Sequence, residues 1–364
     1  MSDSLDQRLL AALRQALHAQ WPLYAAHPLE ALKAKGLAHD HVRLVGTGWL
    51  ARIPKQSQMR LNVADNLAYQ QACFERASPA GHAPQCVRIL APCASLPRGA
   101  LIVQEIVGRS ALLPADLPLM AQSMAAMHSI VLPSPGQHVP LIHAADPLQA
   151  LWDEVQSQAS YLAEAHLEPT VLSQIHSELA QFEAICQDRR RPKRRLIAFD
   201  GHPGNFVIAS IADGREKAYL VDLEKCRYSY PSLDLAHATL YTSTTWDIDT
   251  HTVLNPQEVM DTYQAWGRYV DSALSSDALP WHIPLRRAMW LWSVTWCAKW
   301  RVASRAAAAL RQDGEDWSDE NLDPTLAKHV RARVDHYLSA DGVGIVMAEF
   351  AQLSELMAVE PSAA

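Results

Sequence analysis

The sequence predicts an α+β fold of two unequal lobes, a small β-rich N-lobe and a large, mostly helical C-lobe that contains a short β island. Three observations lead to this prediction. Short β-prone runs recur in the first third of the chain, long helical patterns dominate after Arg109, and one strand-rich segment, residues 195–225, interrupts those helices. We therefore place the N-lobe at residues 1–106, the C-lobe at residues 107–364 and a hinge near residues 105–109.

The N-lobe elements follow from local residue patterns. Leucines recur at helical spacing from residue 5 to residue 17 and predict an amphipathic N-terminal helix. Two β-prone runs flank Gly46-Thr47-Gly48, which predicts a tight hairpin. Further along, the patterns predict a helix and then two buried strands, at residues 62–76, 86–90 and 100–108.

The C-lobe is predicted from six long patterns with helical periodicity. They cover residues 117–130, 147–163, 169–187, 256–275, 284–311 and 324–338. The β island contains three short apolar runs joined by turn-forming Gly and Asp, namely Leu196–Phe199, Phe206–Ile211 and Ala218–Leu223. A cleft between unequal lobes is a preferred position for a ligand site.

Composition limits the class of protein. Of 364 residues, 49% are hydrophobic and 20% are charged, as in ordinary globular chains, and the formal net charge of −7 argues against a dedicated nucleic-acid binder. No apolar run reaches the roughly 18 residues of a membrane span, and the N-terminus lacks the pattern of a secretory signal. The six cysteines form no CxxC pair, which predicts reduced thiols and a cytoplasmic protein.

The β island carries a set of residues typical of phosphoryl-transfer chemistry. Asp200 and Asn205 are five residues apart on a turn rich in Gly and Pro, and Asp222 follows at the end of the third apolar run. Phosphoryl transfer needs one carboxylate to orient the acceptor hydroxyl and take its proton, while an amide oxygen and a second carboxylate hold Mg²⁺ on the phosphates. The alternative is plain turn chemistry, since all these residue types favour turns. The order of strand, loop, hairpin and Asp-x-Glu favours the site.

The stretch LIAFDGHPGNFVI…AYLVDLEKCRYSYPSLDLAH, residues 196–237, resembles the aminoglycoside phosphotransferase and choline kinase family. That family's catalytic segment has the pattern H-G-D-x-H-P-G-N, then I-D-x-E, then D-L-A. The resemblance, which extends more weakly over about residues 40–310, implies a bilobal protein-kinase-like fold. It also implies an enzyme that uses ATP and Mg²⁺ to phosphorylate a hydroxyl of a small molecule.

The same resemblance implies roles for single residues of the motifs. Asp200 would be the catalytic base, and Asn205 and Asp222 would be the magnesium ligands. Glu224 would be an auxiliary acid near the metal or the acceptor. Two positions have structural roles in the family's loop, and they correspond to His202 and Asp234.

The chain departs from the family motif just before the catalytic aspartate, where Ala198-Phe199 stand in place of His-Gly. In the family that His braces the loop, so its loss removes no reacting group. The departure motivates a second hypothesis, a pseudokinase that binds nucleotide or metabolite without turnover. A third hypothesis, a nucleic-acid binder, rests on the basic run from Asp188 to Arg195, whose ordinary explanation is a solvated linker.

The nucleotide side of the site is assigned to the N-lobe. The family has a Gly-containing hairpin over the phosphates and then a basic residue on a strand. The matching positions are Gly46, Gly48, Arg52 and, as a substitute cation, Lys55. An ordinary hairpin with solvated basic residues is the alternative. An acidic partner on the following helix would be Glu75.

The segment LIVQEIVGR, residues 101–109, resembles the family's hinge. Backbone groups from Glu105 to Val107 would meet the adenine edge there. A buried central strand is a simpler explanation that is compatible with this one. The expected partner in the cleft is a nucleoside triphosphate.

Candidate acceptor-binding residues lie in the second half of the chain. Met289, Trp292, Trp296 and Trp300 are spaced for one helix face. Trp292 and Trp296 could form a cation–π wall for a cationic acceptor, whereas packing of the helical core is the favoured alternative. Asp247 could attract the same cation or be a solvated loop residue. The acceptor is expected to be small and hydroxylated, with aminoglycoside, choline-like amine, sugar and hydroxy amino acid all open, and neither nucleic acid nor membrane is an expected partner.

Overall fold

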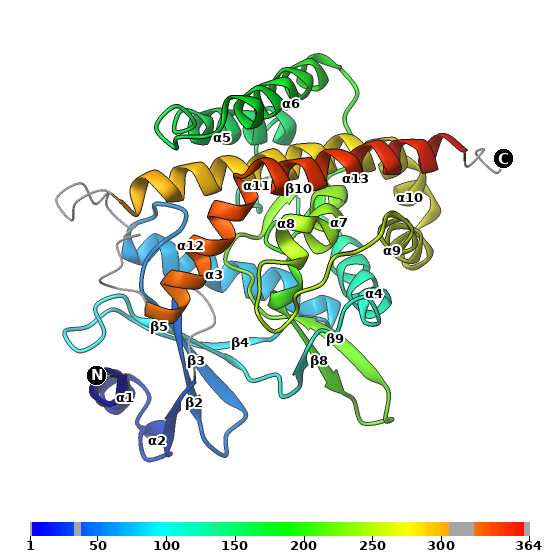
Figure 1. The fold of residues 1–364 in the computed structure, drawn as a ribbon. Coiled ribbons are helices and arrows are strands. Elements are labelled where there is room, and N and C mark those ends of the chain that lie inside the picture. Colours follow the sequence, from blue (N-terminus) through cyan, green and yellow to red (C-terminus); the bar gives the residue numbers. More distant parts are fainter. Residues whose placement is uncertain (1, 33–37, 135, 306–323, 360–364) are drawn as a thin grey trace.

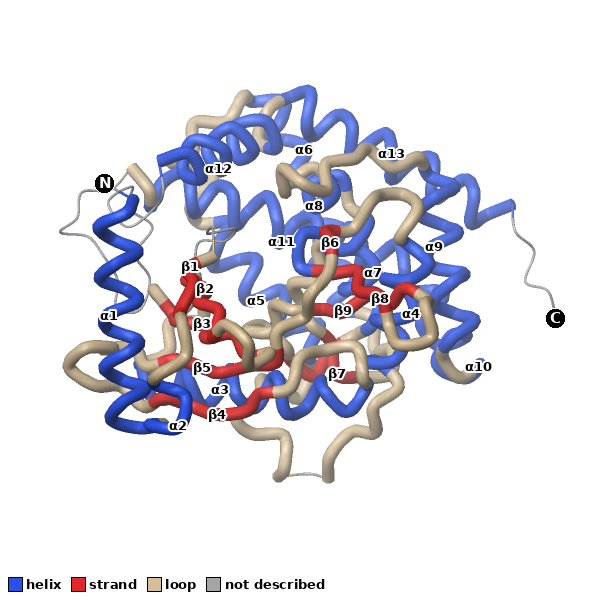
Figure 2. Tube along the Cα trace, turned by 90° about the horizontal axis from the view of Figure 1, so that it is seen from below, coloured by secondary structure: helices blue, strands red, loops and turns tan. Residues whose placement is uncertain are grey.

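The computed structural model describes residues 2–32, 38–134, 136–305 and 324–359. It confirms the α+β fold, with a five-stranded antiparallel sheet in the N-terminal part and a mainly helical remainder (Figure 1). Figure 2 shows the strands gathered in two places, β1 to β5 close to α1 and α3, and the others among the helices of the C-terminal part.

The N-lobe sheet has the strand order β1-β2-β3-β5-β4. Its strands are β1 (Leu29–Ala31), β2 (His39–Leu44), β3 (Trp49–Pro54), β4 (Cys86–Leu90) and β5 (Ala100–Gln104). β2 and β3 form the predicted hairpin, in which the amide and hydroxyl of Thr47 both donate to the carbonyl of Leu44. The predicted strand 100–108 is shorter than expected because it ends at Gln104, where the chain leaves the sheet.

Helices cover both faces of this sheet because its central strands are apolar on both sides. In β5, Leu101 and Val103 pack on the side of α3 (Val63–Ala77). Ala100 and Ile102, which alternate with them along the strand, pack on the side of α1 (Ser2–Gln20). Successive side chains of a strand point to opposite faces, so a continuous apolar run requires a cover on each face. A short helix, α2 (Pro22–Ala25), follows α1.

The C-lobe is built around α11 (His282–Ala303), which packs against α5, α6 and α7 in one hydrophobic core. The other helices are α4 (Leu117–His128), α5 (Pro147–Ala159), α6 (Pro169–Gln187), α7 (Pro231–Thr239), α8 (Tyr241–Thr244), α9 (Pro256–Tyr269), α10 (Ser272–Ala278), α12 (Pro324–Tyr337) and α13 (Ala340–Val359). Three 3₁₀ turns are η1 (Ser78–Ala80), η2 (Pro203–Asn205) and η3 (Leu279–Trp281). In Figure 1, α11 and α13 cross the C-lobe in contact with each other.

Two predicted helices differ from the structure, and several helices were not predicted. The pattern at 256–275 is divided into α9 and α10, because Asp271 accepts a hydrogen bond from the amide of Leu274 at 2.8 Å and starts a new helix. The pattern at 284–311 continues as α11 only to Ala303, and its last six residues lie outside the described ranges. Helices α2, α7, α8 and α13 have no counterpart among the predicted helices.

The three predicted runs of the β island form strands, and these strands lie in two small sheets. β7 (Arg195–Ile197) pairs with β10 (Arg227–Ser229), a strand that was not predicted. β8 (Phe206–Ser210) pairs with β9 (Glu216–Leu220) and with β6 (Arg109–Ser110). The loop that leads from β7 to β8 therefore connects the two sheets, and it contains the predicted catalytic residue.

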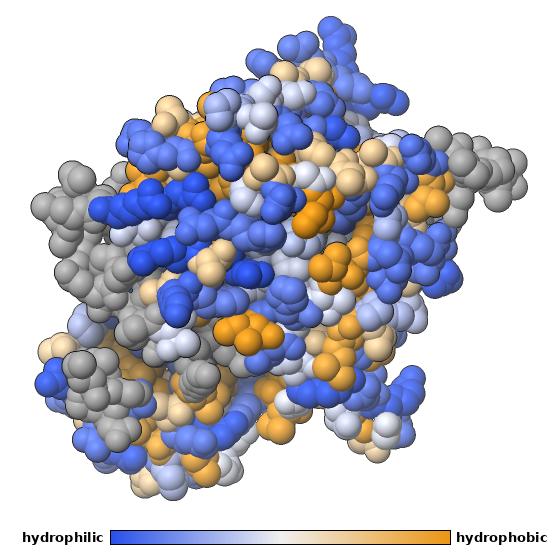
Figure 3. Space-filling view, in the orientation of Figure 1, coloured by the Kyte–Doolittle hydropathy of each residue, from blue (hydrophilic) through white to orange (hydrophobic). Residues whose placement is uncertain are grey.

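Among the helices of the described ranges, none has both the length and the apolar character that a bilayer crossing requires. On the face drawn in Figure 3, hydrophilic residues predominate and the apolar ones are scattered. Many large apolar side chains are instead fully buried, for example Trp266, Trp290 and Phe182.

Candidate active site

The loop of residues 198–205 is held in place by one buried carboxylate. Asp234, on α7, accepts hydrogen bonds from the backbone amides of Ala198 (2.8 Å) and Phe199 (2.7 Å). Nε2 of His128 donates to the same carboxylate at 3.0 Å. The indole of Trp266 donates to Nδ1 of His128 at 3.0 Å, which places the ring proton on Nε2. Asp234 therefore lies behind the loop and orders its first two residues.

Phe199, which stands where the family motif has Gly, has a left-handed backbone with φ of +63°. An L-residue reaches this region at a cost of about 1–2 kcal/mol. Its ring is buried, with the guanidinium of Arg227 3.6 Å from the ring centre and Trp292 in edge contact at 5.2 Å. Nδ1 of His237 donates to its carbonyl at 3.1 Å. These contacts hold a backbone conformation that glycine adopts freely.

The structure brings the three predicted reacting residues together. The side-chain amide of Asn205 donates to the carbonyl of Asp200 at 2.8 Å, and the carbonyl of Asn205 accepts from the amide of Val221 at 2.9 Å. The antiparallel β8–β9 hairpin sets this proximity, because it places the two strand ends side by side. The side chains of Asp200 and Asp222 are 15% and 29% exposed, so neither carboxylate is sealed from solvent.

Lys225 is a functional candidate that the sequence analysis missed. Its Nζ atom lies 2.6 Å from Oδ2 of Asp200 and 5.5 Å from the ring centre of Trp292. Burial raises the pKa of Asp200, but Lys225 and two nearby histidines lower it more, and the net shift is downward. Asp200 is therefore ionised at neutral pH. The one sequence signal for Lys225 is its place directly after the Asp-x-Glu motif.

Arg52, on β3, links the N-lobe to the C-lobe. Its guanidinium donates to Oδ1 of Asp222 at 2.7 Å and to the carbonyl of Val221 at 3.3 Å. Burial raises the pKa of Asp222, but the charge of Arg52 and its hydrogen bond contribute to a larger opposite effect, so the pKa is strongly lowered. The guanidinium of Arg52 in one lobe thus faces the ionised carboxylate of Asp222 in the other.

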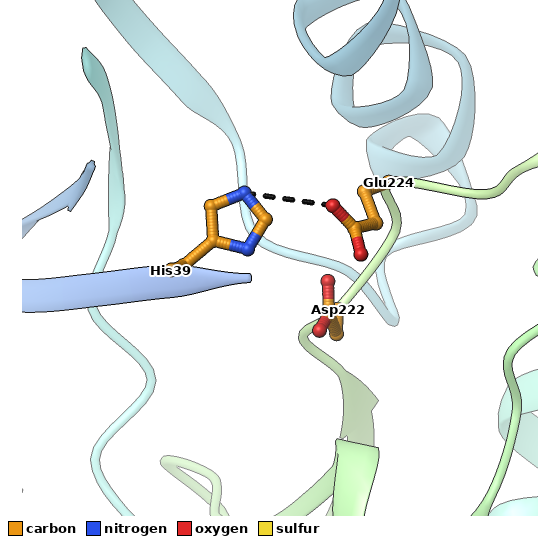
Figure 4. A group of neighbouring side chains, drawn as sticks. All are labelled: His39, Asp222 and Glu224. Carbon is orange, nitrogen blue, oxygen red and sulfur yellow. Dashed lines mark ion pairs between the residues drawn. The ribbon is translucent and has the colours of Figure 1, made fainter. Parts of the chain in front are cut away.

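Three side chains of the two lobes point toward one another in Figure 4, His39 from β2 and Asp222 and Glu224 from the C-lobe. Nε2 of His39 lies 3.6 Å from Oε2 of Glu224. Burial, reinforced by the charge of Asp222, raises the pKa of Glu224 to about 8. Burial and the charge of Arg52 lower the pKa of His39 well below its usual value. At neutral pH the histidine is therefore uncharged.

The structure contradicts the expectation that Glu75 is the acidic partner of Arg52. Glu75 lies on the exposed side of α3, where it accepts a hydrogen bond from Gln71 at 2.7 Å. The helix instead turns Gln70 inward, and its Oε1 lies 3.1 Å from Nε2 of His39. The packing of α3 on the sheet decides which side of the helix meets the cleft. Gln70 lies on that side, and Glu75 lies on the opposite, exposed side.

The structure also places the Gly46–Gly48 turn away from the predicted reacting residues. Arg52 lies four residues along β3 from Gly48, a distance of about 13 Å in a strand. The carbonyl of Gly48 accepts from the amide of Glu105 at 2.8 Å, so the turn adjoins the hinge. The expectation that this turn covers the phosphates stays a prediction, and the structure places the turn at the hinge end of the hairpin.

Of the other predicted nucleotide-binding residues, Lys55 lies at the open end of the hairpin, and Glu105 and Val107 lie at the hinge beside its turn. Lys55 follows β3 and pairs with Asp40 at 3.4 Å. Glu105 lies at the hinge, where its side chain pairs with Arg43 at 2.6 Å. Val107 is 76% exposed. Lys55 is thus on the Arg52 side of the sheet, and the two hinge residues are on the side of the glycine turn.

The predicted acceptor residues fall into two groups. Trp292 is buried, and its indole donates to Oε1 of Glu154 at 2.8 Å, while Trp296 is half-buried in edge contact with Trp246 at 5.8 Å. Asp247 lies directly over the loop, since a Cβ added at Gly204 would lie 2.6 Å from its Oδ2. The tryptophans therefore belong to the edge of the C-lobe core, and the carboxylate belongs to the surface of the loop.

The donor atoms present fit a magnesium ion. Asn205 and Asp222 offer oxygen ligands, the type that Mg²⁺ prefers, and the amide nitrogen of Asn205 is committed to the loop backbone, which leaves its side-chain oxygen for a ligand. The group in Figure 4 also has ligand atoms within 4.8 Å of one another. Both ring nitrogens of His39, however, already contact Arg52 and Gln70, so this histidine is not a preferred ligand.

Comparison with known proteins adds independent information. Residues 30–269 match the model of the phosphotransferase enzyme family. No curated protein sequence matches the chain. An ethanolamine kinase of Plasmodium vivax has 12% identity and a TM-score of 0.54, with 92% of this chain and 88% of that chain covered. A choline/ethanolamine kinase family protein of Mesorhizobium loti has 16% identity and a TM-score of 0.53, with coverage of 94% and 99%.

A third similar structure is the GDP and kanamycin complex of APH(2″)-IIIa, with 16% identity, a TM-score of 0.53, and 93% of this chain and 98% of that chain covered. At these identities the structures show a shared fold. The family match extends from β1 to the end of α9 and thus includes the sheet, the hinge and the loop of residues 198–205. Because that match covers more than half of the sequence, the chain belongs to the phosphotransferase enzyme family.

Proposed function

We propose that this protein is a small-molecule kinase that transfers the γ-phosphoryl group of ATP, with Mg²⁺, to a hydroxyl of its acceptor. The observation that carries the proposal is the meeting of Asp200, Asn205 and Asp222 beside Arg52, where the two lobes face each other. Family membership supports phosphotransfer, and the GDP in a similar structure supports a nucleotide in the cleft.

In the proposed reaction, Asp200 accepts a hydrogen bond from the acceptor hydroxyl and takes its proton as the oxygen attacks the γ-phosphorus. The bond between this phosphorus and the bridging oxygen breaks, and ADP leaves with the electron pair. The lowered pKa keeps Asp200 ionised, as a proton acceptor must be. The hydrogen bonds from the loop to Asp234 hold the Asp200 carboxylate in position, and positioning is one of the two main contributions to phosphoryl transfer.

Asn205 and Asp222 would hold Mg²⁺, which when bound neutralises charge on the β- and γ-phosphates. Arg52 contacts Asp222 and would contact the phosphates beside it. Lys55 lies close by at the end of β3 as a second candidate cation. The turn at Gly46 and Gly48 is not assigned to the phosphates, since it lies by the hinge.

We assign the nucleotide base to the hinge and the acceptor to the outer side of the loop. Backbone groups between Glu105 and Val107 are the candidates for the base edge. Asp247 lies over Gly204 at the loop surface, and a carboxylate there suits a cationic, hydroxylated acceptor. Ethanolamine kinase and the kanamycin complex among the similar structures make an amino alcohol or an aminoglycoside the first classes to test.

A second candidate function is a pseudokinase that binds nucleotide without turnover. The ion pair between Lys225 and Asp200 favours it, because the ammonium takes one oxygen of the carboxylate to which an acceptor hydroxyl would bind. The replacement of His-Gly by Ala198-Phe199 is compatible with either function, because Asp234 still holds the backbone of both residues.

An ADP-release screen over hydroxylated amines, aminoglycosides and sugars, with Mg²⁺ and ATP, tests the proposal. We expect acceptor-dependent release that falls at least a hundredfold in D200N, and thermal stabilisation by Mg²⁺–ATP that is lost in D222A. D213N is the matched control, because Asp213 is an exposed carboxylate of the same β8–β9 hairpin, paired with Arg215. Nucleotide binding without acceptor-dependent release would favour the pseudokinase. The absence of both nucleotide binding and ADP release would exclude both functions.

A further inference from the structure

Lys225 is placed unusually for a lysine. Its side chain is 10% exposed, and its ammonium lies between the carboxylate of Asp200 and the face of Trp292. An ammonium has three N–H donors. Within the described residues, the hydrogen bond to Asp200 at 2.6 Å is the one that Nζ makes, since the contact with Trp292 is with a ring face. Two donors of a buried cation are therefore available for a further partner.

The surroundings of Lys225 suggest the charge of that partner. Trp292 gives the ammonium a neutral, electron-rich face, and the indole nitrogen points away to Glu154. A buried ammonium with unused donors has the chemistry to bind a phosphate, since lysine binds phosphate as a compact point charge. The additional partner would therefore be an anion that enters the cleft.

Geometry then limits which anion this is. In a reactive complex the acceptor oxygen is about 2.7 Å from Asp200 and about 3–3.5 Å from the phosphorus it attacks. A group 2.6 Å from Oδ2 of Asp200 is therefore at most about 9 Å from that phosphorus, and closer where these contacts bend at the shared oxygens. We infer that Lys225 binds the phosphoryl group that is transferred, and that it makes the site distinguish a nucleoside triphosphate from a diphosphate. The inference rests on the proposed function.

This role also explains why Lys225 contacts Asp200, the proposed catalytic base. Before nucleotide binds, Asp200 holds the ammonium in place, so little conformational entropy is lost when the phosphoryl group arrives. The oxygens of the arriving phosphoryl group accept hydrogen bonds from the two unused donors, and the third donor keeps its hydrogen bond to Asp200. The face of Trp292 that could hold a cationic acceptor carries Lys225 instead, so the acceptor is recognised elsewhere.

The test compares the affinity of the protein for Mg²⁺–ATP and Mg²⁺–ADP by isothermal titration calorimetry, with GTP and GDP in parallel. We expect K225M to bind the triphosphate at least tenfold more weakly than wild type, about 1.4 kcal/mol, and to bind the diphosphate within twofold. K225R, which keeps the charge, is expected to retain most of the preference for triphosphate. K217M is the matched control, because Lys217 also places its ammonium over a ring, that of Tyr219 at 5.3 Å, but on β9 outside the site.

The possible outcomes distinguish a failure of the inference about Lys225 from a failure of the proposed kinase function. An equal loss of affinity for both nucleotides, or an unchanged affinity for ATP, in K225M would overturn the inference and leave the proposed kinase standing. A wild-type protein that binds neither nucleotide would overturn both. If K225M does not fold because Asp200 loses its partner, the double variant D200N/K225M removes both charges, and its ATP affinity is compared with that of D200N, which keeps Lys225.

Discussion

The replacement of Asp234 by Asn tests whether one buried carboxylate organises the catalytic loop. In the structure, Oδ2 accepts from His128 and from the amide of Ala198, and Oδ1 accepts from the amide of Phe199. An Asn side chain has one oxygen and one NH₂ group. If the oxygen keeps the partners of Oδ2, the NH₂ group faces the amide of Phe199, and that buried donor has no acceptor.

The magnitude follows from these three hydrogen bonds. An unsatisfied buried donor costs about 1–3 kcal/mol, and the two remaining bonds lose their charge assistance, roughly another 1 kcal/mol in total. The neutral amide avoids the desolvation of a carboxylate, which offsets part of the loss. We therefore expect D234N to lower the free energy of unfolding by about 2 kcal/mol. Because Phe199 is no longer anchored next to Asp200, we also expect turnover to fall by about a hundredfold.

Urea denaturation measures the stability change, and acceptor-dependent ADP release measures the activity. D261N is the control, because Asp261 is an exposed carboxylate on α9 whose side chain accepts one hydrogen bond from the described part of the chain, from Gln257 at 2.8 Å. It should change stability by less than about 0.5 kcal/mol and leave turnover unchanged. A D234N protein that matches wild type within the same limit in stability, and is as active, would refute the role of Asp234 as the anchor of the loop.

Three further predictions concern the loop and its surroundings. F199G should be more stable than F199A by about 1 kcal/mol in urea denaturation, the reverse of the usual order, because only glycine relieves the left-handed backbone; an order of Ala above Gly would contradict the φ of +63°. G204A should lower turnover and cost about 1–3 kcal/mol, because its Cβ would lie 2.6 Å from Oδ2 of Asp247, and wild-type turnover in that variant would show that Asp247 moves aside freely. Burial lowers the pKa of His282 to about 3, so the contribution of neutral His282 to stability is complete above pH 6.5 and is lost as the pH falls toward 3. Between pH 6 and pH 5, the free energy of unfolding of H282Q should therefore fall less steeply than that of wild type, by about 1.4 kcal/mol per pH unit. Parallel curves of unfolding free energy against pH for the two proteins would contradict this prediction.

Much of the fold could be predicted because its signals are local. The helix over residues 169–187 and the hairpin around Gly46 follow from periodicity and turn chemistry, and both are present with the expected bounds or close to them. The short strands β6 and β10 could not be predicted, since pairs of two or three residues are defined by their partners. The division of the pattern at 256–275 depends on one capping residue, Asp271, within a sequence that is otherwise helical.

The candidate site divides in the same way. Asp200, Asn205 and Asp222 were found because they lie within one segment of fixed order, and the hairpin between them brings the ends together. Arg52 was suggested by its strand, but the glycine turn beside it in sequence proved to lie about 13 Å away along the strand. Whether a residue near a motif in sequence is also near it in space depends on strand direction, which a single sequence does not report.

By itself, the sequence determined the two-lobed α+β architecture and the segment that carries the reacting groups, because helix and strand periodicity and the spacing of a loop motif act over short distances along the chain. Only the tertiary structure decided that Arg52 meets Asp222 across 170 residues, that Gln70 replaces Glu75 at the cleft, and that Lys225 holds Asp200. The physical reason is that charge pairing and burial depend on which surfaces the lobes turn toward each other, and the packing of the whole chain sets that orientation.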